Sequence, residues 1–231
     1  MIKAILFDVF GTVVDWRSSL IADLAGWGRA QGVAADWAGL VDAWRAAYIP
    51  SMDSVRGGVW VNFDALHLVS LKRLAPRFGL SDLSAAQWDH INKGWRRLKP
   101  WPDSVPGLQQ LKAHGIVAPL SNGNVAMLED MAQFGRLPWD RIFGADLFQH
   151  YKPDREVYLG ACELLGLAPG QVMMVAAHNY DLQGARACGL RTAFIARPTE
   201  YGPGQTSDLV PESDWDRVAP DILALASQLS I

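Results

Sequence analysis

Cysteine is scarce in this chain of 231 residues, which contains only two, Cys162 and Cys188. Two cysteines cannot build the disulfide framework of a small secreted domain, so we expect free thiols in a reducing cytoplasm. Long apolar runs are also missing, because none approaches the roughly 18 residues that a membrane-crossing helix needs. The opening Met-Ile-Lys leads directly into an apolar segment, and we therefore expect no signal peptide.

A surplus of positive charge is absent as well. The net charge is -3 and the isoelectric point is about 5.9, values that argue against a nucleic-acid binder. Half of the residues are hydrophobic, which is enough for a substantial core. We therefore expect a globular protein that acts on a small molecule, with neither a nucleic-acid nor a membrane partner.

Strand-like and helix-like segments alternate along most of the chain. Short apolar patterns typical of buried strands occupy residues 1–10, 115–120, 171–175 and 191–195. Helical patterns occupy residues 105–114, 125–134, 155–165, 181–188 and 220–229. This alternation predicts an α/β fold with a doubly wound parallel sheet and right-handed crossovers. The segment 199–216, rich in Gly, Pro and acidic residues, is predicted to be a surface loop.

Residues 16–99 interrupt this alternation with one helical pattern after another and no convincing strand pattern. Ser18 or Ser19 is expected to cap the first of these helices, and Asp36 the second. Seven of the ten tryptophans lie in this stretch. We therefore expect an α/β core made of residues 1–15 and 100–231, with an inserted helical cap domain made of residues 16–99.

Polar side chains follow three of the predicted strands. Asp8 ends the first strand, Ser121 follows the second, and the segment 177–181 follows the third. Because the carboxyl ends of parallel strands meet at one edge of the sheet, these residues should converge in a crevice there. The Gly-Thr turn after Asp8 offers backbone N–H groups that can hold an anion.

Four segments together resemble the motifs of the haloacid dehalogenase superfamily. They are the strand ending in Asp8, Ser-Asn-Gly at 121–123, Tyr-Lys-Pro at 151–153, and the segment 175–181 with Asp181. Most members of that superfamily are magnesium-dependent phosphatases, with a second Asp two residues after the nucleophile and a Gly-Asp metal ligand before the last acid. This chain has Phe10 and Ala177 at those positions, and its histidines share no ligand spacing, so we predict no metal and no cofactor.

These substitutions favour displacement at carbon over phosphoryl transfer. Phosphoryl transfer needs cationic compensation and an acid for the leaving alkoxide, whereas a halide leaves as a stable anion. The carboxylate of Asp8 can attack the carbon that bears the halogen and form an ester, which water then hydrolyses. The resemblance thus narrows to the L-2-haloacid dehalogenases, supported by Trp-Arg at 44–45, by Trp-Val-Asn-Phe at 60–63 and by a Phe-Asp-x-Tyr-Gly-Thr motif with Phe10 replacing the usual Tyr.

The resemblance implies the roles of individual residues. Asp8 is the nucleophile, Lys152 keeps it ionised, and Asp181 orients Lys152 and positions or activates the hydrolytic water. Arg45 and Asn122 solvate the leaving halide, Ser121 holds the substrate carboxylate, and Thr12 anchors the turn. The full predicted catalytic set is Asp8, Thr12, Arg45, Ser121, Asn122, Lys152 and Asp181. The substrate-binding set is predicted to be Val9, Phe10, Ile49, Trp60, Phe63, Tyr158, His178, Asn179 and Tyr180, with the backbone amides of Val9 and Phe10 also holding the carboxylate.

One segment departs from the family. Many members have Ser-Ser-Asn before the aromatic residue and the last Asp, where this chain has Ala177, His178 and Asn179. Either His178 or Asn179 is a candidate to hold the lytic water. We also consider that His178, with Tyr180, Trp60 and Phe63, forms a donor-rich halide pocket able to accept fluoride.

The sequence therefore predicts a metal-independent hydrolase that converts small 2-haloalkanoic acids to 2-hydroxy acids. The resemblance implies L-specificity, inversion of configuration and a homodimer, and fluoroacetate is a further candidate substrate. Three alternatives stay open: a related hydrolase acting on another activated carbon centre, a magnesium-dependent phosphatase, and a catalytically inactive binding module.

Overall fold

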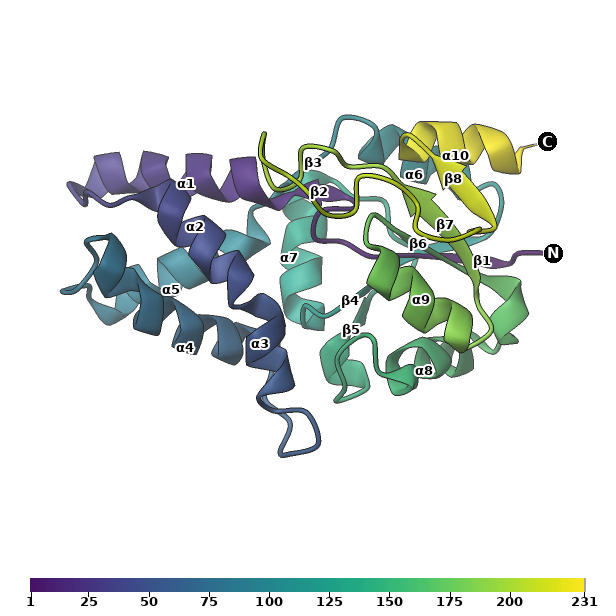
Figure 1. Ribbon diagram of the computed structural model, residues 1–231, viewed down its shortest axis with the longest axis horizontal. Helices are drawn as coiled ribbons and strands as arrows, with labels where there is room; N and C mark the ends of the chain where they lie inside the picture. The colour runs from purple at the N-terminus through teal and green to yellow at the C-terminus, as the bar shows by residue number, and fades with distance from the viewer. Residues whose placement is uncertain (231) are drawn as a thin grey trace.

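The computed structural model describes residues 1–230 and contains a six-stranded parallel sheet flanked by helices (Figure 1). The strands are β1 (Ala4–Phe7), β4 (Ile116–Ser121), β5 (Phe143–Gly144), β6 (Val172–Ala176), β7 (Arg191–Ile195) and β8 (Arg217–Ala219). Their order is β5-β4-β1-β6-β7-β8, and every neighbouring pair is parallel. This arrangement confirms the predicted doubly wound α/β fold.

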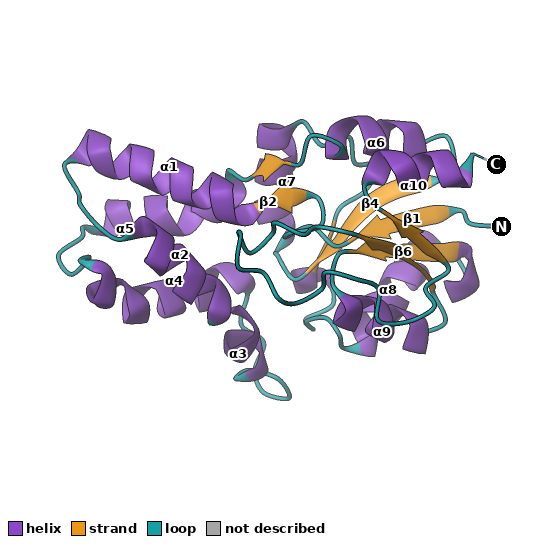
Figure 2. Ribbon diagram, turned by 45° about the horizontal axis from the view of Figure 1, so that its top comes forward, coloured by secondary structure: helices purple, strands orange, loops and turns teal. Residues whose placement is uncertain are grey.

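Helices cover both faces of the sheet (Figure 2). They are α6 (Ser104–Leu111), α7 (Val125–Gly135), α8 (Arg155–Leu165), α9 (Asn179–Ala187) and α10 (Ile222–Leu229), with short 3₁₀ helices η3 (Ala145–Leu147) and η4 (Pro169–Gln171). Successive side chains of a strand point to opposite faces. Accordingly, Ile5 and Phe7 join the hydrophobic cluster under α6 and α10, whereas Ala4 and Leu6 join the cluster under α8 and α9.

The helical insert leaves and rejoins the core through a short antiparallel pair, β2 (Val14–Asp15) and β3 (Lys99–Pro100). Its helices are α1 (Trp16–Gln31), α2 (Trp37–Ala46), α3 (Tyr48–Asp53), α4 (Phe63–Leu74) and α5 (Ala85–Asn92), with 3₁₀ helices η1 (Ala75–Phe78) and η2 (Lys93–Arg96). In Figure 1 these helices form a layer beside the sheet and separate from the core helices. Among residues 1–230, no helix combines the length and apolarity needed to cross a bilayer.

Several local predictions need correction. The N-cap of α1 is Asp15, whose carboxylate accepts a hydrogen bond from the Ser18 amide, so neither Ser18 nor Ser19 caps this helix. The N-cap of α2 is Asp36, as predicted. The strand pair β2–β3 lies at the two ends of the helical insert, where the sequence predicted no strand. The strands β5 and β8 were not predicted either. Each of these strands has only two or three residues, too few to show a periodic pattern.

The topology places the functional site at the carboxyl ends of the strands. Strand β1 lies between β4 and β6, and Phe7 pairs with Pro119 on one side and with Val175 on the other. The residues that follow these partners therefore emerge at the same edge of the sheet. After β1, the chain adds β4 and β5 on one side of it and then β6, β7 and β8 on the other side. The strand order therefore reverses next to β1, and ligands of open α/β sheets bind at such a switch point.

Candidate active site

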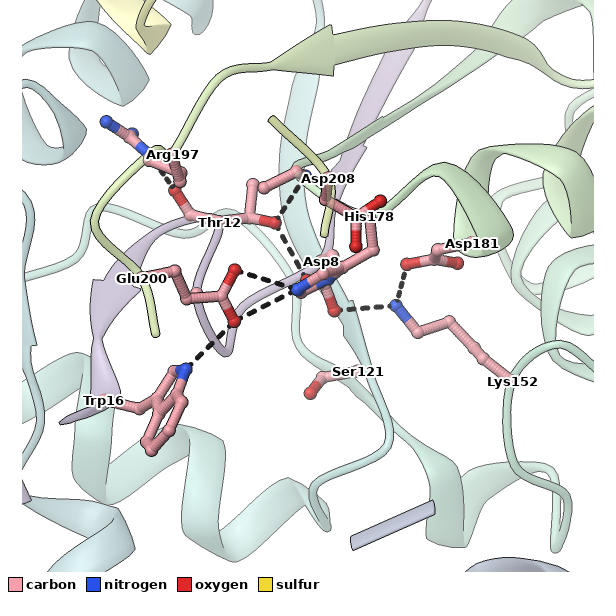
Figure 3. A network of polar contacts seen from close by, with 12 residues as sticks. Asp8, Thr12, Trp16, Ser121, Lys152, His178, Asp181, Arg197, Glu200 and Asp208 are labelled. Carbon is pink, nitrogen blue, oxygen red and sulfur yellow. Dashed lines mark hydrogen bonds and ion pairs between the residues drawn. The ribbon is translucent and has the colours of Figure 1, made fainter. Parts of the chain in front are cut away.

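Asp8 is the centre of a buried polar network at this edge (Figure 3). Its Oδ2 accepts a hydrogen bond of 2.8 Å from the Thr12 hydroxyl, and its Oδ1 accepts one of 2.9 Å from Nζ of Lys152. The Thr12 hydroxyl oxygen in turn accepts a hydrogen bond of 2.8 Å from the Ala177 amide. The Thr12 oxygen thus accepts from the Ala177 amide, and the Thr12 hydroxyl proton is donated to Asp8.

Lys152 lies between two carboxylates. Its ammonium group donates hydrogen bonds to both Asp8 and Asp181, and it is 2% exposed. The other oxygen of Asp181 accepts a hydrogen bond of 2.6 Å from the Tyr158 hydroxyl. The backbone amide of Lys152 donates to Oδ1 of Asn122 at 2.7 Å, which fixes the loop that carries it. The structure thus brings together five residues of the predicted catalytic set, namely Asp8, Thr12, Asn122, Lys152 and Asp181.

The charges of this network set its protonation states. Burial alone would raise the pKa of Asp8, but the charge of Lys152 and the hydrogen bond from His178 hold that pKa below its ordinary value. Burial raises the pKa of Asp181, and the negative charge of Asp8 raises it further. The charge of Lys152 opposes these two effects but does not outweigh them, so the pKa lies above its ordinary value. Asp8 is therefore held in its ionised form, and Asp181 is the more basic of the two carboxylates.

His178 lies between Asp8 and a residue that the sequence did not indicate, Glu200. Nδ1 of His178 is 3.1 Å from Oδ2 of Asp8, and Nε2 is 3.0 Å from Oε2 of Glu200. Burial lowers the pKa of a histidine, but the charge of Glu200 and the hydrogen bonds to both carboxylates raise the pKa of His178 well above its ordinary value. His178 is therefore a buried imidazolium with both N–H groups directed at carboxylates.

Glu200 connects the core to the helical insert. Its carboxylate accepts a hydrogen bond of 2.9 Å from the Trp16 indole in α1 and lies 3.6 Å from the Arg45 guanidinium in α2. Both partners belong to the insert, and Glu200 itself is 1% exposed. The carboxylate also fills the space beside Gly11, where an added Cβ atom would come within 2.2 Å of it. Glu200 lies in the segment predicted to be a surface loop, where no pattern distinguishes it from other acidic residues.

Arg45 faces a cavity of about 330 Å³ that is also lined by Ile49 and Tyr180. Ile49 and Tyr180 also line a second cavity of about 320 Å³ that reaches Lys152. The Arg45 guanidinium lies 4.3 Å from the ring centre of Tyr48, and its Nη1 has no hydrogen-bond partner within residues 1–230. Asp8 lines neither cavity, which leaves the nucleophile shielded from solvent.

Other predicted residues lie close to this site. Phe10 stacks on Phe63 with ring centres 5.8 Å apart, in the aromatic cluster between core and insert. Ser121 is fully buried, and its Oγ accepts a hydrogen bond from the Gly123 amide. Figure 3 shows the Ser121 side chain near Asp8. The carbonyl of Val9 accepts hydrogen bonds from the amides of the turn that follows.

Three residues of the predicted substrate-binding set have their side chains engaged within the protein. The side chain of Asn179 bonds Asp208 and the Val210 carbonyl and accepts from the amide of Glu212 and the indole of Trp215, so it anchors the 199–216 loop. Tyr158 is fully buried, and its hydroxyl positions Asp181. Trp60 packs on Tyr151 with ring centres 4.6 Å apart and lines a separate cavity of about 290 Å³.

The proposed fluoride pocket is also revised. Both ring nitrogens of His178 are engaged by Asp8 and Glu200, so neither is free to donate to a halide. Trp60 lies in the other cavity, away from His178. Of the four predicted members, only Tyr180 is adjacent to His178, with ring centres 5.8 Å apart.

Comparison with known proteins identifies the family. Residues 2–189 match the model of the haloacid dehalogenase-like hydrolases. The chain belongs to the haloacid dehalogenase-like hydrolases. It is 31% identical over 207 residues to an (S)-2-haloacid dehalogenase of Burkholderia cepacia, and the match covers 87% of both chains. It is also 31% identical over 207 residues to an (S)-2-haloacid dehalogenase of Pseudomonas sp. strain CBS-3, and that match covers 87% of this chain and 88% of the relative.

Two solved structures of this haloacid dehalogenase-like family are also similar. A crystal structure of an L-2-haloacid dehalogenase shares 54% sequence identity with a TM-score of 0.94, covering 99% of this chain and 100% of that one. A crystal structure of a defluorinating L-2-haloacid dehalogenase shares 45% identity with a TM-score of 0.93, covering 100% and 96%. The membership predicted from the four motifs is confirmed.

Many haloacid dehalogenase-like hydrolases use magnesium, but the residues around Asp8 do not fit this ion. Phe10 presents an aromatic ring, and Ala177 presents only its backbone N–H. Two cationic groups, Lys152 and His178, already contact the Asp8 oxygens. Within residues 1–230, no group of three or more His, Cys, Asp or Glu side chains is arranged so that it could hold a metal ion. The site around Asp8 therefore does not fit a magnesium ion.

Proposed function

We propose that this protein hydrolyses the carbon–halogen bond of small 2-haloalkanoic acids through an ester of Asp8, without a metal ion. The observation that carries the proposal is the buried Asp8 held ionised by Lys152, with Phe10 at the position where a phosphatase has its proton donor. A halide needs no proton to leave, so the lack of a donor at Phe10 does not hinder this reaction. The names of the relatives, which include (S)-2-haloacid dehalogenases, support the same substrate class.

In the first half-reaction, an oxygen of Asp8 attacks C2 of the acid, and the halide leaves with the bonding electrons. Preorganised donors stabilise the charge that develops on a leaving group. Arg45 and Asn122 are suited to this task, because Arg45 Nη1 and Asn122 Nδ2 are buried without a hydrogen-bond partner in the described part of the chain. Tyr180 supplies an aromatic wall beside Arg45.

The carboxylate of the substrate needs donors of its own. Ser121 and the backbone amides of Val9 and Phe10 are the proposed donors, since they lie at the end of β1 and β4 beside Asp8. Neither of these two amides has a hydrogen-bond acceptor among residues 1–230. Thr12 fixes the position of Asp8 through its hydrogen bond. Phe63 and Ile49 present apolar surface to the site.

In the second half-reaction, water adds to the carboxyl carbon of Asp8. Asp181 is the proposed acceptor of the water proton, because its raised pKa makes it the more basic of the two carboxylates bound by Lys152. The bond between the ester oxygen and Cγ of Asp8 then breaks, and the alkoxide takes the proton from Asp181 to give the 2-hydroxy acid. The second proton of the water, left on the Asp8 carboxyl group, is released to solvent and the carboxylate is restored. One oxygen of the water stays in Asp8.

Finer properties belong to the same proposal. We propose L-specificity with inversion, activity on fluoroacetate, a cap function for residues 16–99 over a core of residues 1–15 and 100–231, a homodimer, and a cytoplasmic location. The link from Glu200 to Arg45 and Trp16 supports the cap, because it joins the insert to the core beside Asp8. The similarity to a defluorinating enzyme supports fluoroacetate as a substrate.

The decisive experiment is incubation with racemic 2-chloropropionate in the presence of EDTA, with chloride release and the remaining enantiomer measured together. We expect chloride release, consumption of the L enantiomer only, and no activity in Asp8→Asn. A single turnover in ¹⁸O-water should place the label in Asp8 and not in the product. Hydrolysis of a phosphate ester that EDTA abolishes, without chloride release, would support the phosphatase alternative, and activity on another activated carbon centre without halide release would support the related hydrolase.

Fluoroacetate is tested separately with a fluoride electrode. Fluoride release above the Asp8→Asn background is expected. An absence of fluoride release with intact chloride release would restrict the substrates to the weaker carbon–halogen bonds.

A further inference from the structure

The two oxygens of Asp8 have unequal surroundings. Oδ2 accepts two hydrogen bonds, from the Thr12 hydroxyl at 2.8 Å and from Nδ1 of His178 at 3.1 Å. Oδ1 accepts one, from Lys152 at 2.9 Å. A carboxylate oxygen has about two lone pairs for hydrogen bonds. Oδ2 is therefore saturated, and the free lone pair for attack on carbon belongs to Oδ1.

This difference assigns the oxygens in the second half-reaction. If Oδ1 bonds to the substrate carbon, Oδ2 becomes the carbonyl oxygen of the ester. When water then attacks Cγ, the carbonyl electrons move onto Oδ2, which becomes an oxyanion. The donors that face this oxygen, Thr12 and His178, are already in place in the free enzyme.

We propose that His178 and Thr12 form the oxyanion hole for hydrolysis of the Asp8 ester, and that Glu200 is the positioning residue that holds His178 as an imidazolium. The inference rests on the proposed function and adds a role for two residues in its second step. Water adds to Cγ, its proton passes to Asp181, and the negative charge resides on Oδ2. The Cγ–Oδ1 bond then breaks, the charge leaves Oδ2, and the product alkoxide takes the proton.

Glu200 is required because His178 must stay charged after Asp8 has been esterified. The ester removes the negative charge of Asp8, which is one of the two carboxylates facing the imidazole ring. Glu200 then remains as the sole carboxylate within hydrogen-bond distance of His178 among residues 1–230. Without it, a buried imidazole would lose its proton, since burial favours the neutral form.

The charge balance of the site supports the same assignment. Three buried anions and three buried cations meet there, namely Asp8, Asp181 and Glu200 against Lys152, His178 and Arg45. Esterification leaves this set with one excess positive charge, which the substrate carboxylate balances. The further negative charge on Oδ2 in the tetrahedral intermediate falls on the oxygen that Thr12 and His178 already contact.

Because both ring nitrogens of His178 face carboxylates, His178 does not act as the general base in this arrangement. A general base needs a free lone pair toward the water. The groups that face the ring are Asp8 just after β1, Glu200 from the 199–216 loop and Tyr180 from α9, with Arg45 next to Glu200. None of these leaves a nitrogen open to accept a proton.

The first test separates the two half-reactions by rapid quench with enzyme in excess of 2-chloropropionate. His178→Ala should release about one chloride per molecule of reactive substrate at nearly the wild-type rate and then hydrolyse the ester roughly 10²–10³ times more slowly, as expected for loss of one oxyanion donor. Intact-protein mass spectrometry should show the accumulated ester. His178→Asn, which restores a neutral donor near the place of Nδ1, should recover part of the hydrolysis rate.

The second test uses Glu200→Gln, which keeps the shape of the side chain and its contact with Trp16. Its ester-hydrolysis rate should fall as pH rises through the neutral range, because the imidazolium loses its charge there, while the wild-type rate stays flat. Asp214→Asn makes the same chemical change at an exposed site of the same loop and should behave as wild type. Circular dichroism verifies the fold of each variant.

The outcomes distinguish this inference from the proposed function. If the wild type releases no halide, the proposed function fails. If the wild type dehalogenates but His178→Ala slows chloride release and ester hydrolysis equally, or Glu200→Gln retains the flat pH profile, the oxyanion hole is overturned. If His178→Ala does not fold, the pH profile of Glu200→Gln decides alone.

Discussion

The ammonium nitrogen of Lys152 lies 2.9 Å from Oδ1 of Asp8, although 144 residues separate the two in the chain. Both side chains are almost fully buried, and the same ammonium group also contacts Asp181. One cation thus compensates two carboxylates inside the protein. The contact keeps Asp8 ionised, and it also makes the stability of the fold depend on Lys152.

Replacement of this cation should destabilise the protein. Lys152→Met leaves two buried carboxylates without their shared partner, so the free energy of unfolding should fall by about 3–5 kcal/mol at neutral pH. The loss should be smaller near pH 4, because the carboxylates of the variant have raised pKa values and protonate there. Urea unfolding at several pH values measures this. Lys93→Met, which removes an exposed helix pair with Asp89, should cost only about 0.3–0.5 kcal/mol.

His178 predicts a pH dependence of the opposite sign. Its folded-state pKa is raised, so its contribution to stability is fully present below the unfolded value of about 6.5 and is lost as pH rises through the folded value. The difference in unfolding free energy between wild type and His178→Asn should therefore shrink above pH 6.5, by about 1.4 kcal/mol per pH unit. Urea unfolding between pH 5 and 10 measures it. A constant difference across this range would contradict a buried imidazolium.

Arg45 should not be replaceable by lysine. Arg45→Lys keeps a positive charge near Glu200 but loses the flat guanidinium that lies over Tyr48 and beside Trp16. A desolvated contact of this kind is worth roughly 2 kcal/mol, so kcat/KM for 2-chloropropionate should fall about 30-fold and inhibition by added chloride should weaken. Arg17→Lys, at a surface pair with Asp42, serves as the control and should leave both quantities unchanged.

Asn179 should act on stability more than on substrate binding. Its amide side chain donates to Asp208 and the Val210 carbonyl and accepts from the Glu212 amide and the Trp215 indole. Asn179→Ala leaves the indole N–H of the buried Trp215 without its acceptor and should cost about 1–3 kcal/mol of unfolding free energy. Limited proteolysis should cut the 199–216 loop faster. A raised KM with an unchanged melting temperature would restore the substrate contact that the sequence predicted.

Much of the fold follows from local patterns. The helix at 155–165 and the strand at 191–195 have the bounds that their periodicity predicts, because each buries a regular apolar face. The strands β5 and β8 were missed because two or three residues carry no period. Asp15 replaced Ser18 and Ser19 as the cap of α1 because the β2–β3 pair fixes where the insert begins.

The candidate site divides in the same way. Asp8 and Asp181 were predicted because each lies in a short motif after a predicted strand, and Lys152 because it lies in the Tyr-Lys-Pro motif. Tyr158, Trp60 and Asn179 were predicted near the substrate, but the structure turns them toward Asp181, Tyr151 and the 199–216 loop, respectively. The orientation of a side chain depends on neighbours that are distant in the chain, and no local pattern encodes it.

The sequence by itself determined the α/β class, the place of the nucleophile and the family, because these depend on periodicity and on short motifs. Only the tertiary structure decided that Glu200, 22 residues beyond His178, meets that histidine, Trp16 and Arg45 at one point. A loop position has no periodic partner, so its neighbours are set by how the loop folds back over the sheet. That contact makes His178 an imidazolium, since a buried charge is stable only beside an opposite one.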